Sequence, residues 1–446
     1  EAEGAPLTRS TIIITAGAVL ILLMTALLAL TRASFRIKES AFGQLTMLHG
    51  GATRSLTAVG ALGVAFAFAV GFVAELRTAL GAVAILLLAL TLYAFWMTRA
   101  ETFLKARAWP PLLIMLLLYA AVIVGYGKLR WEGGARSYHA RHLIDDSSIR
   151  PKAVEHARAW IEAHATAEGD IPAVVVLAEG GGIYAAYNVA GGLVALDEAT
   201  DDSFYEYVYG MSGVSGGSVG IAAYLAARAD FENPSERRAA IDKFMANDFL
   251  SPLVAGLFFR DSPFRFVPVA DIISERLGVA KDRARLFEGE LSRRWQEANT
   301  DGTPTERWFE KPLSEVAEAA RRSVPAGPIV LLNAAREADG RVETISNVSF
   351  GEADDSERLV NLLDRLAKQK KSVPLAAAAH MSARFPVASP RAAVEVEEAS
   401  RRSVYFFVDG GYADNSGAAA AATAVTALRE AAQAIASDCR EGRCPV

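Results

Sequence analysis

Four long apolar runs occupy the first third of the chain, and they constrain its fold more than any other feature. They cover residues 11–30, 56–74, 80–97 and 110–127. A transmembrane helix needs about 20 apolar residues, and soluble cores rarely contain about 18 in a row without a charge. Residues 1–128 are therefore predicted to form a membrane region with four spanning helices.

The predicted spans carry almost no ionisable side chains, which argues against a transporter and favours an anchor. Gly60, Gly63 and Gly71 in the second run would allow helices to pack closely. Lys and Arg are almost equally frequent on the two sides, so the positive-inside rule does not decide the orientation. If the C-terminal domain lies outside the cytoplasm, Cys439 and Cys444 can form a disulfide.

The rest of the chain is predicted to be organised around one α/β domain. Residues 129–170 form a connector, residues 171–436 the domain, and residues 437–446 a tail. A mainly helical, charge-rich insert is expected at about 230–325. The net charge of −5 gives no indication of a nucleic-acid partner, and two cysteines cannot make a zinc site.

Apolar strands alternate with helices in this domain. Strands are predicted at 173–178, before Ser215, at 328–333 and at 404–408, and helices at 183–197 and 418–435. Continuous apolar strands that run into tight loops and helices are typical of a mainly parallel sheet covered on both faces.

A glycine-rich turn after the second of these strands has the layout of a nucleophile elbow. Residues 213–217 and 216–220 both fit G-x-S-x-G, so the pattern alone proposes two serines, Ser215 and Ser218. We favour Ser215 because it lies nearer the end of the strand and leaves Ser218 free to cap the following helix.

The elbow has no obvious histidine partner. Only His380 follows Ser215, and it lies in an alanine-rich helical segment where a packing role is expected. Asp409 follows the strand at 404–408, at the sheet edge where α/β proteins place their ligands. A Ser215–Asp409 dyad, in which the carboxylate accepts the hydroxyl proton, is the simplest remaining arrangement. Gly180, Gly181 and Gly182 offer backbone N–H groups for an oxyanion hole.

These three motifs in this order resemble the patatin-like phospholipase family, and in particular its membrane-associated bacterial members. The resemblance covers about residues 171–435. It implies a three-layer α/β/α fold, the Ser215–Asp409 dyad and hydrolysis of lipid esters without a metal or cofactor. Together with the four apolar runs, it predicts a multi-pass protein of the bacterial cell membrane with a membrane lipid as substrate. The supporting motif residues are Gly213, Gly217, Gly410, Gly411 and Asn415.

The glycine loop departs from the family pattern. The family usually has G-G-G-x-Arg/Lys-G, whereas this chain has Tyr184 and Ala185 in place of the basic residue and the last glycine. The backbone donors survive this change, but charge recognition at the loop does not follow from the resemblance.

Three alternatives remain open at the level of sequence. Gly180-x-Gly182-x-x-Ala185 also fits a loose dinucleotide-binding pattern, with Asp197 or Glu198 near the position of the acidic residue. The chain could instead be an inactive membrane scaffold, or transfer acyl groups with the same dyad.

Overall fold

The computed structural model describes residues 49–106, 114, 117, 120, 143–146, 150–165, 172–262, 282–299, 305–322, 324–351, 359–398 and 401–440. The chain divides into two compact units. The first combines Glu1–Tyr138 with Asp248–Phe287, and the second combines His139–Asn247 with Glu288–Val446.

Two apolar helices form the basis of the first unit. Helix α2 spans His49–Phe72 and α3 spans Ala74–Ala106. They contain the predicted runs at 56–74 and 80–97, and the helical conformation is interrupted at Val73, between α2 and α3. Within α3, Gly81 departs from helical geometry with φ 74° and ψ 160°. Only glycine adopts such a positive φ at little cost, so the kink lies where the sequence permits it.

Glycines bring α2 and α3 into close contact, as expected. A Cβ at Gly63 would lie 2.7 Å from Leu92 Cδ2, and one at Gly60 would collide with the ring of Phe95. Since the earlier glycine meets the later residue of α3, the two helices are antiparallel.

Part of the helical insert predicted at about 230–325 packs against these two helices. Helix α9 (Leu250–Gly256) and the π-helical turn η2 (Leu257–Asp261) contribute Ala255 and Phe259 to the same buried cluster as Ala67 and Ile85. Arg260 Nε donates a hydrogen bond of 2.7 Å to the carbonyl of Gly71, at the C-terminal end of α2. Residues 248–287, which sequence analysis assigns to the α/β domain, thus belong to the first unit.

One helix among the described residues is long and apolar enough to cross a membrane. It covers Ala74–Thr102, and Thr57–Phe72 is a shorter apolar helix. The predicted runs at 11–30 and, apart from three single positions, at 110–127 lie outside the described residues. The four-helix membrane region therefore stays a prediction.

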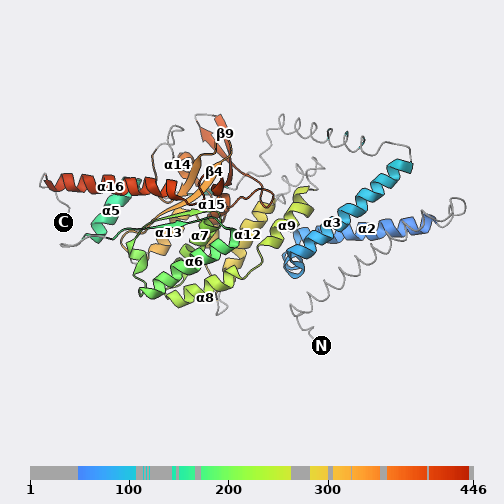
Figure 1. Ribbon diagram of the computed structural model, residues 1–446, viewed down its shortest axis with the longest axis horizontal. Helices are drawn as coiled ribbons and strands as arrows, with labels where there is room; N and C mark the ends of the chain where they lie inside the picture. The colour runs from blue at the N-terminus through green and yellow to red at the C-terminus, as the bar shows by residue number, and fades with distance from the viewer. Residues whose placement is uncertain are drawn as a thin grey trace. The chain divides into compact units, whose positions relative to one another are not determined.

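The second unit is built on a mixed sheet whose strands can be followed in Figure 1. Strands β2 (Val174–Ala178), β3 (Val208–Val214) and β4 (Ile329–Arg336) are parallel, as predicted. The strand predicted at 404–408 is β9 (Arg401–Asp409), but it pairs antiparallel with β4. Two strands were not predicted: β5 (Val342–Ser346), which pairs antiparallel with β4, and β8 (Ala392–Glu398), which pairs antiparallel with β9. Strand β6 (Val360–Asn361) pairs with β5, and β1 (Ile144–Asp145) pairs with β7 (Lys371–Ser372) in a separate small sheet.

Two strands meet end to end along one side of β4. Strand β5 pairs with β4 at residues 331–335, so it occupies one side, and β3 pairs on the other side at residues 329–333. Strand β9 pairs with residues 334–336 and, because β5 already covers 334 and 335, it must lie on the side of β3. Parallel β3 ends at Val214 and antiparallel β9 ends at Asp409, so both strands end at the same point beside β4.

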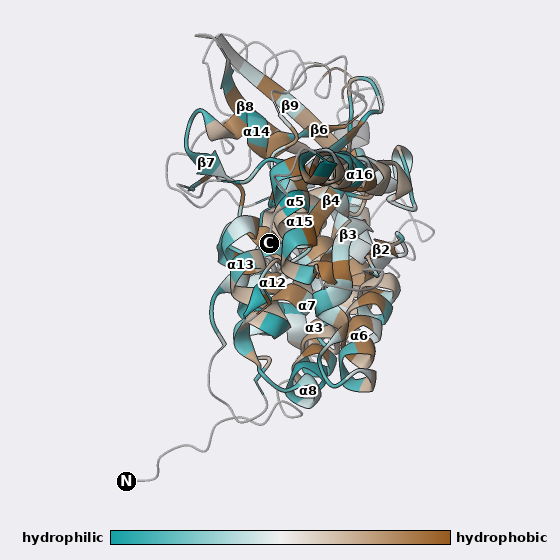
Figure 2. Ribbon diagram, turned by 90° about the vertical axis from the view of Figure 1, so that its left-hand side faces the viewer, coloured by the Kyte–Doolittle hydropathy of each residue, from teal (hydrophilic) through white to brown (hydrophobic). Residues whose placement is uncertain are grey.

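Helices cover both faces of the sheet (Figures 1 and 2). Helices α5 (Ala153–His164) and α16 (Ala418–Arg440) share a buried cluster with Tyr209 of β3 and Ile329 and Leu331 of β4. Helices α6, α7 and α15 cover the opposite face. They span Gly182–Ala199 (α6), Gly216–Asp230 (α7) and Leu375–Ser382 (α15). The remaining described helices are α8 (Pro234–Met245), α12 (Arg283–Gln296), α13 (Leu313–Arg321) and α14 (Leu362–Ala367). Three short turns are η1 (Phe204–Tyr207), η3 (Trp308–Glu310) and η4 (Gly410–Tyr412).

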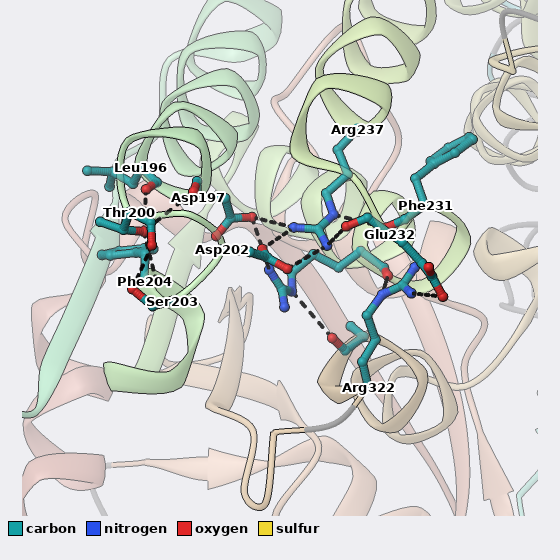
Figure 3. A network of polar contacts seen from close by, with 12 residues as sticks. Leu196, Asp197, Thr200, Asp202, Ser203, Phe204, Phe231, Glu232, Arg237 and Arg322 are labelled. Carbon is teal, nitrogen blue, oxygen red and sulfur yellow. Dashed lines mark hydrogen bonds and ion pairs between the residues drawn. The ribbon is translucent and has the colours of Figure 1, made fainter.

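A buried ionic network connects the helices of this second layer (Figure 3). Asp197 Oδ2, near the end of α6, accepts hydrogen bonds from Arg228 of α7 at 3.1 Å and Arg237 of α8 at 3.0 Å. Asp202 accepts from the same two guanidinium groups, and Tyr224 donates to Asp197 at 2.9 Å. Removing one member of such a network leaves buried charge uncompensated, which is strongly destabilising.

Asp197→Ala is expected to lower the free energy of unfolding by about 3 kcal/mol, because it removes one of the two carboxylates that compensate the buried charges of Arg228 and Arg237. Denaturant unfolding of the purified full chain measures the change. Asp242→Ala, which breaks the exposed pair with Arg238, is the control, with an expected loss of about 0.5 kcal/mol or less. Equal unfolding midpoints for the two variants would contradict a stabilising role for the network.

Candidate active site

Ser215 lies on a strained turn between β3 and α7. Its φ of 52° and ψ of −123° place a non-glycine residue in a region that costs about 1–3 kcal/mol and is typical of functional turns. The two following glycines allow this turn to approach the loop after β2. A Cβ at Gly216 would collide with the carbonyl of Gly182, and one at Gly217 with the carbonyl of Ala178. The elbow therefore requires glycine at both positions.

Ser215 and Asp409 are brought together where β3 and β9 end. Ser215 Oγ donates a hydrogen bond of 2.8 Å to Asp409 Oδ2, and Asp409 Oδ1 accepts one of 2.9 Å from the N–H of Gly411. Gly410 lets this loop pass the sheet, because a Cβ there would collide with the carbonyl of Asn333. Asp409 is buried, and this burial raises its pKa above the ordinary value, although the two hydrogen bonds oppose the shift. A raised pKa makes the carboxylate a better proton acceptor.

The other candidate nucleophile, Ser218, and the other candidate base, His380, have hydrogen-bond partners other than Ser215 and Asp409. Ser218 is fully buried and donates to Ser382 Oγ at 2.8 Å. His380 is bonded through Nδ1 to Glu288 at 3.1 Å and through Nε2 to Ser389 at 3.0 Å. His380 is thus buried and hydrogen-bonded on both ring nitrogens, as expected for a packing histidine in an alanine-rich helix.

The glycine loop lies beside Ser215, but its three N–H groups differ in what they contact. A Cβ at Gly180 would lie 3.2 Å from Ser215 Cβ. The N–H of Gly180 donates to the carbonyl of Asn415 at 3.2 Å, so it joins the two loops of the site and is not available to a substrate. Within the described part of the chain, the N–H groups of Gly181 and Gly182 at the start of α6 donate to no protein acceptor. Of the three glycines predicted to form the oxyanion hole, Gly181 and Gly182 thus have N–H groups that could donate hydrogen bonds to a substrate oxygen.

Sequence analysis missed the role of Ser382, the last residue of α15. Its Oγ accepts from the backbone N–H of Ser215 at 2.8 Å and from Ser218, and donates to the carbonyl of Asn333. Asn333 in turn donates to Ser212 Oγ at 2.9 Å and to the carbonyl of Gly213 at 3.0 Å. Ser382 therefore holds the strained backbone of Ser215. No local pattern around Ser382 indicates this contact, because it joins residues 167 positions apart in the sequence.

A second polar cluster fixes the segment after α15. Glu288 Oε1 accepts from Arg384 Nη2 at 2.6 Å as well as contacting His380, and Arg384 Nη1 donates to the carbonyl of Pro390 at 2.9 Å. The carbonyl of Arg384 accepts from the N–H of Asp409 at 3.2 Å. This cluster thus supports the backbone that carries Asp409.

The comparison with known families agrees with this geometry. The model of the patatin-like phospholipase family matches residues 176–422, which is more than half of the chain. The chain belongs to the patatin-like phospholipase family. Among solved structures, human GIVD cytosolic phospholipase A2 is similar, with a TM-score of 0.28 and 16% identity over 44% of this chain. The match spans only 26% of that protein. The search of curated proteins found no match.

The structure does not place Asp197 where the dinucleotide-binding alternative requires an acidic residue. It requires a carboxylate at the end of the second strand, whereas Asp197 lies in α6 and is bonded to Arg228 and Arg237. The carbonyl of Gly182 also packs against Gly216 of the elbow. The glycine loop therefore belongs to the serine site.

The reaction of Ser215 with an uncharged fluorophosphonate is expected to slow as the pH falls. Below its raised pKa, Asp409 becomes protonated and can no longer accept the hydroxyl proton, so the labelling rate falls. The rate of adduct formation, followed by mass spectrometry, should show a midpoint above the ordinary aspartate value of about 3.9. Tryptophan fluorescence over the same pH range controls for unfolding. A rate that stays constant down to that value would contradict the base role.

Ser382→Ala is expected to slow labelling of Ser215 by about 10–100-fold, because small displacements of reacting groups have effects of this size. Ser218→Ala is the matched control: it removes a donor to Ser382 but leaves the bond between Ser382 and the N–H of Ser215. It should cause a smaller loss and keep the adduct on Ser215. Equal rates for Ser382→Ala and the wild type would show that the elbow does not need this hydroxyl.

Proposed function

We propose that this protein is a membrane-bound serine acyl hydrolase that cleaves carboxylic esters of lipids through a Ser215–Asp409 dyad. The observation that carries the proposal is the 2.8 Å hydrogen bond from Ser215 Oγ to the buried carboxylate of Asp409. Membership of the patatin-like phospholipase family supports lipid esters as the substrate class.

Acylation begins when Asp409 Oδ2 accepts the Ser215 proton and Oγ attacks the ester carbonyl carbon. The carbonyl oxygen becomes an oxyanion, to which the N–H groups of Gly181 and Gly182 can donate. Each preorganised donor of this kind is typically worth about 10²–10³ in rate. When the tetrahedral intermediate collapses, protonated Asp409 returns its proton to the leaving alcohol, and the acyl group stays on Ser215.

Deacylation repeats these steps with water. Asp409 accepts a proton from a water molecule, whose oxygen attacks the acyl-enzyme carbonyl, and the Ser215 oxygen leaves with that proton. The free fatty acid is released and both residues return to their initial state. A single carboxylate thus acts as base and acid in both halves of the reaction.

The apolar N-terminal region supports an integral membrane location. The helix at Ala74–Thr102 and the further apolar runs of the sequence would hold the catalytic unit near its lipid substrates. Cys439 of α16 is disulfide-bonded, and the sequence has one other cysteine, Cys444, which lies outside the described residues. Disulfides persist in oxidising compartments, which favours an extracytoplasmic catalytic unit.

Asp409→Asn and Ser215→Ala are each expected to reduce hydrolysis of a soluble p-nitrophenyl ester by at least about 10³-fold, because triad-type residues act as a unit. Release of p-nitrophenol by the purified full chain measures the effect, and circular dichroism checks the fold.

Asp414→Asn is the matched control for the same chemical change in the same loop. Asp414 accepts hydrogen bonds from Ser416 and from the N–H of Ala419 near the start of α16, and it contacts neither dyad residue. Its variant should keep most of the activity. If Asp409→Asn retains activity comparable to that of Asp414→Asn, the dyad mechanism is wrong.

A further inference from the structure

Exposed apolar and aromatic side chains lie on the segments next to the dyad. Ile183, Tyr184, Phe385 and Tyr412 are exposed by 52%, 77%, 61% and 58%. We refer to these four residues as the uncharged rim. Large exposed apolar side chains gathered at one site typically mark a contact with a ligand, a partner or a membrane. Tyrosine suits a surface with one apolar and one wet side.

Each part of the uncharged rim is tied to the site through the backbone. Ile183 and Tyr184 follow Gly182, whose carbonyl packs against Gly216 of the elbow. Phe385 follows Arg384, whose carbonyl accepts the N–H of Asp409 at 3.2 Å. Tyr412 follows Gly411, whose N–H donates to Asp409 Oδ1. The four residues of the uncharged rim therefore each lie one or two positions after a residue whose backbone contacts the elbow or Asp409.

The segments that carry the rim present no exposed cation. They are residues 177–187, 383–390 and 410–417, all of which the structure describes. Their one basic residue is Arg384, whose side chain is buried and bonded to Glu288 and to the carbonyl of Pro390. The charged groups otherwise present are the carboxylates of Glu179 and Asp414. An anionic head group beside these three segments would meet their carboxylates, and the segments themselves offer it no exposed guanidinium or ammonium group.

We propose that the uncharged rim makes this enzyme select ester lipids whose head groups are uncharged or zwitterionic, and that the rim contacts them at a lipid surface. The proposal rests on the hydrolase function above and adds the substrate class. Tyr184 is its central residue, because it occupies the position where the family loop usually has a basic side chain. There it gives the head group an aromatic surface in place of a cation.

The test compares three substrates with identical acyl chains in mixed micelles of a nonionic detergent: diacylglycerol, phosphatidylcholine and phosphatidylglycerol. The wild-type full chain should hydrolyse the first two at least about fivefold faster than the third, the factor expected for one missing cation near an anionic surface. Tyr184→Arg should raise the relative rate on phosphatidylglycerol by a similar factor, whereas Tyr184→Phe should keep the wild-type order. Equal wild-type rates on the three lipids, or an unchanged order in Tyr184→Arg, would overturn the proposal.

A second comparison tests contact with the lipid surface. Ile183→Ser lies at the start of α6 and should lower the ratio of micellar to soluble-ester hydrolysis by about tenfold, the expected effect of removing one buried apolar side chain. Leu196→Ser removes a similarly exposed side chain, at 44%, near the other end of the same helix, and should leave that ratio at its wild-type value. Equal ratios for both variants would show that the rim does not touch the lipid.

The soluble p-nitrophenyl ester separates the two claims. If the wild type cleaves neither this ester nor any lipid, the hydrolase function and the substrate class both fail. If it cleaves the soluble ester but does not discriminate among the three lipids, the hydrolase function stands and the selectivity fails.

Discussion

The site depends on how β4 is paired. Because β5 occupies one side of β4, strands β3 and β9 must share the other, and they approach from opposite directions. Their ends bring Ser215 and Asp409, 194 residues apart in sequence, into a hydrogen bond. Backbone pairing thus supplies the geometry of the dyad, while Gly216, Gly217 and Gly410 remove the side chains that would prevent it.

The remaining contacts hold this junction in place. Ser382 binds the N–H of Ser215, and Asn415 accepts the N–H of Gly180, so the elbow, the glycine loop and the loop of Asp409 are joined by hydrogen bonds. Three segments far apart in the sequence are therefore fixed relative to one another before a substrate binds. Such preorganisation is what transition-state stabilisation by backbone donors requires.

The local part of this arrangement could be predicted from sequence. Strands β2, β3 and β4, the helices after β2 and β3, and the elbow follow from apolar runs and glycine positions. The shortage of histidines directs attention to Asp409. The long-range pairing of the strands was less predictable, because nothing local in residues 392–409 indicates that β9 pairs antiparallel with both β4 and β8. The use of the Gly180 N–H by Asn415 and the role of Ser382 depend on contacts between distant loops. The packing of residues 248–261 against α2 and α3 could not be predicted either, because their apolar side chains do not indicate which element they pack against.

The central claim is that Ser215 cleaves lipid esters. The most direct measurement is digestion of a total membrane lipid extract by the purified full chain, with mass spectrometry of the released fatty acids. We predict that the wild type releases fatty acids and depletes a defined set of ester lipids, while Ser215→Ala, folded to the same extent, releases none above the enzyme-free control. Equal release by the wild type and Ser215→Ala would contradict the account.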